Sequence, residues 1–223
     1  MADVKACVFD AYGTCFDVAA AAAHCKDGLG DNWEPLAEIW RTKQLNYTWL
    51  RSLMNEYKDF WQVTEDALDF ALDTLAISDQ SLRNKLLALY EELDAYAEVP
   101  DVLKDLKGQG ITTAILSNGS EKMLASAVHG AGIADLLDDV ISVNSLKVYK
   151  PHPSVYQLGV DELGVEKERI CFMSSNAWDV AGAANFGFQV VWVNRFGQSV
   201  ERLPGKPVHT ISDLSELPPL LDV

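Results

Sequence analysis

The sequence predicts an α/β fold: a doubly wound, Rossmann-like parallel sheet with a helical cap inserted after the first strand. Two observations predict it. Short apolar runs alternate with helical patterns along most of the chain, and about eighty residues after the first run show no strand pattern. Near-continuous apolar runs separated by amphipathic segments are typical of parallel strands with helices on both faces.

Six apolar runs predict the strands, the last of them weakly: residues 5–10, 111–118, 139–143, 170–175, 189–194 and 208–211. Helical patterns between them predict helices over residues 101–109, 121–130, 153–163 and 178–186. Because consecutive strands are joined through helices, they should run parallel and end at one common edge of the sheet.

The segment 16–97 predicts a separate helical unit. Its apolar residues recur at steps of three and four, and two further helical patterns cover 64–76 and 79–94, the latter capped by Asp79. Such an insertion is far too long for an ordinary strand–helix connection. We therefore predict a core of residues 1–15 and 98–223 and a cap of residues 16–97. The recurring apolar residues are Leu36, Ile39, Trp40, Tyr47, Leu50, Met54, Tyr57 and Trp61.

Composition excludes several classes of partner. The formal net charge of −15 would repel nucleic acids and anionic membrane surfaces. The chain contains no apolar run of membrane-spanning length, and its first residues do not resemble a signal peptide. The four cysteines form no CxxC pair, so we expect free thiols and a cytoplasmic protein. These cysteines are Cys7, Cys15, Cys25 and Cys171.

Polar residues follow four of the predicted strands. In an open parallel sheet, ligands bind at the carboxyl ends of the strands. Each polar group alone could be a turn, a helix cap or an exposed bend, but four such groups at one edge predict a catalytic site. The candidates are Asp10, Thr14, Ser117, Asn118, Lys150, Ser174, Asn176 and Asp179.

Five motifs carry a family resemblance: FDAYGTCFD, WRTKQLNYTWL, ILSNGS, VYKP and SSNAWD. Together they resemble the 2-haloacid dehalogenase branch of the haloacid dehalogenase superfamily, over essentially the whole chain. The resemblance implies a hydrolase acting on carbon–halide bonds, which converts an (S)-2-haloacid and water into an (R)-2-hydroxyacid and halide through an aspartyl ester. It also implies a homodimer.

The residues themselves favour halide over phosphate as the leaving group. A phosphatase of this fold needs Mg²⁺, held by several oxygen ligands, and an acid at position 12 to protonate the departing alcohol. This chain has Tyr12 there, and Ser174, Ser175 and Asn176 stand where a further acidic ligand would be expected. A halide leaves as a stable anion without a proton, so we expect neither a metal nor another cofactor.

The first chemical step is assigned to the residues after the first strand. Asp10 is the predicted nucleophile, which forms the covalent ester. By resemblance Lys150 lies close to Asp10 and keeps its carboxylate ionised and oriented. Thr14 would brace the loop that carries Asp10.

The second step needs water aimed at the ester carbonyl. Asp179 is the predicted base, with Ser174 and Asn176 ordering the site. Asp179 could instead only fix Lys150, and the sequence does not separate these roles. Tyr156 matches a functional tyrosine of the branch, but its helical position also suits packing.

Substrate contacts are predicted from both parts of the chain. Ser117 would bind the substrate carboxylate, and Arg41, from the predicted cap, would meet the departing halide with help from Asn118. Backbone N–H groups would complete an anion nest, and three apolar side chains would line the pocket. The backbone N–H groups are those of Ala11, Tyr12 and Asn118. The apolar side chains are Leu45, Phe60 and Trp178.

Two other functions remain open at this stage. One is a Mg²⁺-dependent small-molecule phosphatase of the same fold, against which Tyr12 stands. The other is a ligand-binding protein that keeps the fold without turnover, although all the polar positions named above are present and nothing in the sequence favours it.

Overall fold

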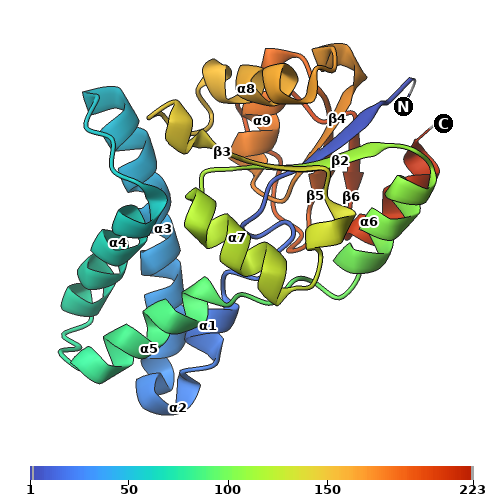
Figure 1. Cartoon of the computed structure of the whole chain (residues 1–223). Coiled ribbons are helices and arrows are strands. Elements are labelled where there is room, and N and C mark those ends of the chain that lie inside the picture. The colour runs from blue at the N-terminus through green and yellow to red at the C-terminus, as the bar shows by residue number, and fades with distance from the viewer. Residues whose placement is uncertain (2, 222–223) are drawn as a thin grey trace.

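The computed structural model, which describes residue 1 and residues 3–221, shows a parallel sheet flanked by helices (Figure 1). The described strands run in the order β3-β2-β1-β4-β5-β6, and all neighbours are parallel. This confirms the predicted α/β fold. The strands are β1 (Ala6–Phe9), β2 (Thr112–Ser117), β3 (Asp139–Ser142), β4 (Ile170–Ser174), β5 (Gln189–Val193) and β6 (His209–Ile211).

The first strand lies in the middle of the sheet. Every residue of β1 is buried, and Phe9 pairs with Ile115 of β2 on one side and with Met173 of β4 on the other. The N–H of Asp10 still donates to the Met173 carbonyl oxygen at 2.9 Å. Asp10 therefore leaves the sheet between β1 and β4, where the strand order reverses and ligands of such sheets bind.

The core helices follow the predicted pattern within a few residues at each end. They are α6 (Val99–Gly108), α7 (Glu121–Gly130), α8 (Pro153–Leu163) and α9 (Ala177–Phe186). No helix in the described part of the chain is long and apolar enough to cross a bilayer. All four cysteines are buried free thiols.

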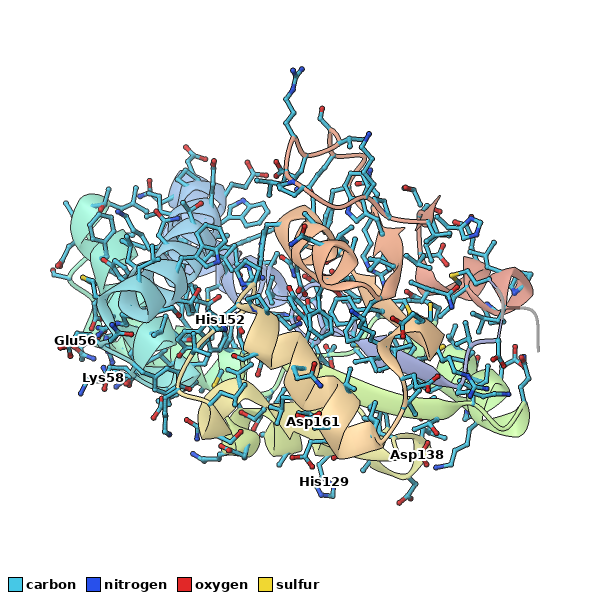
Figure 2. All side chains as sticks on the ribbon, turned by 90° about the horizontal axis from the view of Figure 1, so that it is seen from above. Glu56, Lys58, His129, Asp138, His152 and Asp161 are labelled. Atoms are coloured by element: carbon cyan, nitrogen blue, oxygen red, sulfur yellow. The ribbon has the colours of Figure 1, made fainter. Side chains whose placement is uncertain are left out.

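In the described part of the chain, five α-helices precede α6 in the long stretch between β1 and β2, and these five lie to one side of the sheet (Figure 1). In Figure 2, Glu56 and Lys58 mark this inserted part, whereas Asp138 and Asp161 lie on the core. Residues 2, 222 and 223 of the predicted core lie outside the described residues. The inserted helices are α1 (Ala20–Ala23), α2 (Lys26–Leu29), α3 (Trp33–Met54), α4 (Phe60–Thr74) and α5 (Gln80–Glu91).

The apolar periodicity that runs to Trp61 does not belong to one helix. Helix α3 ends at Met54 because Asn55 adopts a left-handed conformation, with φ of 57°. A new helix then begins after Asp59, whose carboxylate caps it by accepting a backbone N–H three residues on at 3.0 Å. The end of α3 also turns outward: Leu50 is 50% exposed and Met54 60% exposed, so these two of the recurring apolar residues lie at the surface.

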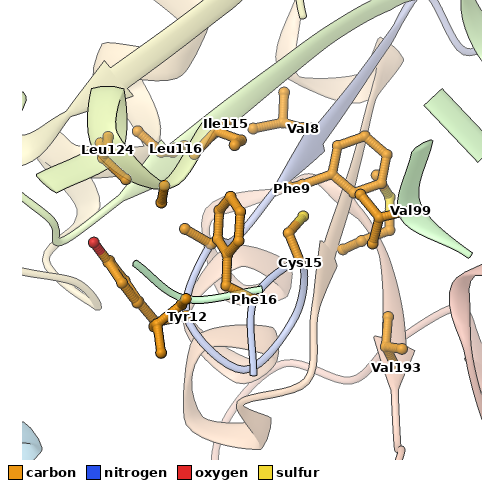
Figure 3. Close-up of a cluster of buried hydrophobic side chains, with 14 of the residues drawn as sticks. Val8, Phe9, Tyr12, Cys15, Phe16, Val99, Ile115, Leu116, Leu124 and Val193 are labelled. Atoms are coloured by element: carbon orange, nitrogen blue, oxygen red, sulfur yellow. The ribbon is translucent and has the colours of Figure 1, made fainter. Parts of the chain in front are cut away.

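The turn after β1 is tight and separates Tyr12 from the polar edge. The Ala11 carbonyl oxygen accepts the N–H of Phe16 at 3.0 Å, and Gly13 reaches φ of 91°, which favours glycine. The Tyr12 ring packs in the apolar cluster of Figure 3, stacked 5.9 Å from the Tyr90 ring. Tyr12 thus presents its main chain, rather than a proton-donating side chain, to the site.

Helices α8 and α9 approach closely only because Gly182 has no side chain. A Cβ atom there would lie 2.5 Å from the Tyr156 hydroxyl and 2.6 Å from Pro151 Cβ. We expect Gly182→Ala to lower the free energy of unfolding by about 1–3 kcal/mol through overpacking. Gly130→Ala, also in a helix but with nothing near the new Cβ, is the control and should be neutral or stabilising. Chemical denaturation measures both, and equal effects would contradict this packing.

Candidate active site

A buried lysine lies between two buried aspartates at the carboxyl edge of the sheet. Lys150 Nζ is 3.0 Å from Asp10 Oδ1 and 2.9 Å from Asp179 Oδ2. The three residues are 1%, 6% and 0% exposed, respectively. An ammonium group thus binds both carboxylates in a region of low dielectric, where their attraction is strong.

Burial and charge oppose each other in this cluster. Burial alone would lower the pKa of Lys150, but the charges of Asp10 and Asp179 raise it above its ordinary value. Burial raises the pKa of Asp179, and the Lys150 ammonium opposes that rise. Lys150 is therefore a stable cation, on which the ionised form of Asp179 depends.

The second oxygen of Asp179 is also occupied. Tyr156, fully buried on α8, donates its hydroxyl to Asp179 Oδ1 at 2.8 Å. Burial, and then the nearby Asp179 charge, raise the pKa of Tyr156 well above its usual range, so it stays a neutral donor. Tyr156 thus lies behind Asp179 and orients it. With both oxygens bonded, Asp179 in turn holds Lys150.

The other oxygen of Asp10 faces polar groups from both loops. Thr14 donates its hydroxyl to Asp10 Oδ2 at 3.1 Å, while its Oγ1 accepts the N–H of Ser175 at 2.8 Å. Ser175 also donates its hydroxyl to the Gly13 carbonyl oxygen at 2.7 Å. The Ser174 hydroxyl lies 3.5 Å from Asp10 Oδ2. The loop after β4 thus fixes the turn that carries Asp10.

Asn176 connects Asp10 to the inserted helices. Its amide nitrogen donates to Asp10 Oδ2 at 2.8 Å and to the Tyr12 carbonyl oxygen at 3.1 Å. Because a carbonyl oxygen only accepts, the amide oxygen of Asn176 must face the other way, where Arg41 Nη2 donates to it at 3.1 Å. A guanidinium from α3 is therefore placed one side chain away from Asp10.

Donors for an anion remain at the end of β2. Ser117 Oγ accepts the N–H of Gly119 at 3.1 Å, so its own hydrogen can be offered elsewhere. Asn118 Oδ1 accepts the N–H of Lys150 at 3.0 Å, which turns the amide nitrogen of Asn118 away from that N–H. Both residues are buried, at 1% and 7% exposure.

Two cavities flank Arg41, and Gly13 lines both of them. The one of ≈ 380 Å³ reaches Asn176 and is also lined by Leu45 and Trp178, the two predicted pocket residues. The other, of ≈ 250 Å³, is lined mainly by residues of the segment 16–97. The larger cavity reaches the polar cluster at Asn176, which contacts Asp10 directly.

One predicted pocket residue lies outside both cavities, and two residues that contact the site were given no role from the sequence. Phe60, a predicted pocket residue, is buried against the Tyr12 ring at 5.6 Å and lines neither cavity. Sequence reasoning gave no role to Ser175, or to Gln44, which accepts a hydrogen bond from Arg41. Both stand inside quoted motifs, which is the one signal that could have pointed to them.

The described residues contain no group of three or more His, Cys, Asp or Glu side chains that could hold a metal ion. A model of the haloacid dehalogenase-like hydrolases matches residues 4–187. The chain belongs to this family.

Within this hydrolase family, the similarity extends over nearly the full length of named relatives. The chain is 46% identical over 222 residues to (S)-2-haloacid dehalogenase 1 of Pseudomonas sp. (strain CBS-3), covering 99% of this chain and 98% of that protein. A crystal structure of a dehalogenase superposes with a TM-score of 0.98 at 44% identity, covering 100% and 99% of the two chains.

A third relative is the L-2-haloacid dehalogenase from Xanthobacter autotrophicus, solved with chloropropionic acid covalently bound. It superposes with a TM-score of 0.91 at 38% identity, covering 97% of this chain and 98% of that one. Within the haloacid dehalogenase-like hydrolases, this chain therefore resembles the dehalogenases in both sequence and structure.

Removing the central cation should destabilise this hydrolase in a pH-dependent way. We expect Lys150→Met to lower the free energy of unfolding by about 3–5 kcal/mol near neutral pH, because it leaves two buried carboxylates without their partner. Without the ammonium, the pKa of Asp179 rises further above 3.8. A carboxyl group whose pKa is higher in the folded than in the unfolded protein stabilises the fold at acid pH, and this contribution is lost as the pH rises through the two pKa values. The loss of stability in Lys150→Met should therefore shrink toward acid pH.

Denaturation at several pH values measures this effect. Lys104→Met is the control, because Lys104 forms an exposed ion pair with Asp101 and should cost little at any pH. A Lys150→Met deficit that is small, or that grows toward acid pH, would contradict the assigned charges.

Proposed function

We propose that this protein hydrolyses short-chain (S)-2-haloacids to (R)-2-hydroxyacids and halide, through an ester on Asp10 and without a metal ion. The single observation that carries this proposal is the environment of Asp10. Its carboxylate is bound to the Lys150 ammonium, an arginine lies one side chain away, and position 12 supplies no acid.

In the first step, Asp10 attacks the carbon that bears the halogen, from the side opposite the carbon–halogen bond. A carbon–oxygen bond forms as the halogen leaves with the bonding electron pair, and the configuration at that carbon inverts. Hydrogen bonds from Thr14 and Asn176 orient the attacking carboxylate. Arg41 meets the negative charge that develops on the halide.

Charge balance supports this step. Before the attack, Asp10, Lys150 and Asp179 together carry one net negative charge. Formation of the ester neutralises Asp10, so Lys150 and Asp179 then form a neutral buried pair, which is the cheaper arrangement in low dielectric. The excess negative charge leaves with the halide, past the guanidinium of Arg41.

In the second step, water adds to the carbonyl carbon of the Asp10 ester. The acyl–oxygen bond breaks, the departing alkoxide takes one of the two protons of the water and leaves as the hydroxyacid, and Asp10 regains a carboxylate that contains one oxygen from water. Ser174 and Asn176 lie beside Asp10 Oδ2 and would order this water. Asp179, the second carboxylate on Lys150, would take the proton that the water loses.

The substrate carboxylate would bind at the end of β2. Ser117 and the amide of Asn118 offer donors there, together with the main-chain N–H groups of Ala11 and Tyr12. Leu45 would contact the alkyl chain from the larger cavity. Trp178 lines the same cavity.

We also propose that the helices of residues 16–97 act as a cap over the core, and that the protein is a cytoplasmic homodimer. The exposed apolar end of α3 supports association with a second copy, because Leu50, Leu53 and Met54 are 50%, 80% and 60% exposed. Four free thiols are consistent with the reducing cytoplasm.

Halide release from the two enantiomers of 2-chloropropionate tests the proposal. We expect chloride and (R)-lactate from the (S) enantiomer, with the same rate after treatment with EDTA, and no comparable rate from the (R) enantiomer. Asp10→Asn should abolish release, because an amide is a poor nucleophile.

p-Nitrophenyl phosphate serves as the comparison substrate, with added Mg²⁺. Its turnover, together with absence of chloride release, would contradict the proposal and support a phosphatase. Ligand binding without turnover of any substrate would support a binding protein instead.

A further inference from the structure

We propose that Gln44 is a positioning residue that aims Arg41 at the departing halide, and that its own orientation is set by Thr64 of the neighbouring helix. The proposal deepens the proposed function and rests on it. It concerns how the inserted helices hold a flexible cation over a buried nucleophile. Gln44 is 1% exposed and Thr64 is fully buried.

The contact between Gln44 and Arg41 lies within α3. Arg41 Nη1 donates to Gln44 Oε1 at 2.7 Å, and the three-residue spacing puts both side chains on one face of the helix. With Nη1 bound to Gln44, Nη2 is directed to the Asn176 amide oxygen at 3.1 Å and to the Tyr12 carbonyl oxygen at 3.4 Å. One end of the guanidinium is thus anchored, and the other faces the site.

The orientation of the Gln44 amide is fixed by Thr64. The Thr64 hydroxyl donates its only hydrogen to the Phe60 carbonyl oxygen, one turn earlier in α4, at 2.7 Å. Thr64 Oγ1 can therefore only accept from Gln44, and it lies 2.8 Å from Nε2. The amide nitrogen of Gln44 must face Thr64, so the amide oxygen faces Arg41.

The remaining contacts make this network rigid. Tyr90 OH lies 3.0 Å from Gln44 Nε2 and 3.3 Å from its Oε1. Trp40 Nε1 donates to the Thr64 carbonyl oxygen at 2.9 Å, which ties α3 to α4 at the same level. A buried amide with satisfied donors and acceptors has one favourable orientation, because any flip would leave polar groups unpaired.

Arginine carries considerable side-chain freedom, so an unanchored guanidinium would have to be ordered in each turnover. If Gln44 holds the Arg41 guanidinium in one orientation, removing Gln44 should weaken stabilisation of the leaving group rather than binding of the haloacid carboxylate. Chloride is a poorer leaving group than bromide and depends more on the cation. The expected signature is therefore a loss of rate that depends on the halogen.

The experiment compares wild type and Gln44→Met on (S)-2-chloropropionate and (S)-2-bromopropionate. We expect kcat/KM for the chloro substrate to fall about ten- to hundredfold, and less for the bromo substrate. Inhibition by added sodium bromide should weaken in parallel. An equal fold loss for both substrates, with unchanged inhibition by bromide, would overturn the proposal.

Two further variants separate positioning from packing. Trp40→Phe removes a hydrogen bond between the same helices but leaves Gln44 and Arg41 joined, so it should alter both substrates equally. Thr64→Val removes the acceptor that orients Gln44, and it should reproduce the dependence on halogen. If Gln44→Met does not fold, Thr64→Val decides: a shifted chloro-to-bromo ratio supports the proposal, and an unchanged ratio overturns it.

The activity of the wild type distinguishes failure of the role of Gln44 from failure of the proposed function. If wild type releases halide from both substrates and the variants show no dependence on the halogen, only the role of Gln44 fails. If wild type releases no halide from either substrate, the proposed function itself fails.

Discussion

The ammonium of Lys150, buried between two carboxylates, is the interaction on which the rest of the structure depends. A buried charge is costly unless it is paired, and here each charge is paired through the same lysine. The arrangement fixes Asp10 in position while excluding most solvent from it. On the proposed function, a nucleophile held in this way needs only a reacting carbon and a site for the departing anion.

The parts of the chain that meet around this lysine come from distant segments. The sheet brings together the turn after β1, the end of β2, the segment before α8 and the loop after β4. The inserted helices add a second cation, Arg41, from outside the sheet. On the proposed function, the two cations have separate tasks: Lys150 pairs with a charge that is present at the start, and Arg41 meets a charge that appears during the reaction.

Much of this could be predicted from the sequence, for a definite physical reason. Apolar runs reveal buried parallel strands, and parallel strands end at one edge, so the polar groups that follow them could be expected to gather there. The closeness of Lys150 to Asp10 was implied by the family resemblance. Gln44 could not be placed in this way, because its orientation depends on Thr64 in another helix, and local periodicity carries no information about how two helices pack. The same periodicity hides the break at Asn55, and the alanine-rich segment at 19–23 lacks the polar alternation that would have revealed α1.

The most direct test of the central claim is a single turnover in heavy-oxygen water, with enzyme in excess over (S)-2-chloropropionate. If the carboxylate held by Lys150 attacks carbon and water then attacks the ester, the first turnover places the heavy oxygen in the peptide that contains Asp10, and the lactate carries an ordinary oxygen from the protein. Mass spectrometry of peptide and product reads both. Heavy oxygen in the first lactate, with none in that peptide, would show direct attack by water and would contradict the account.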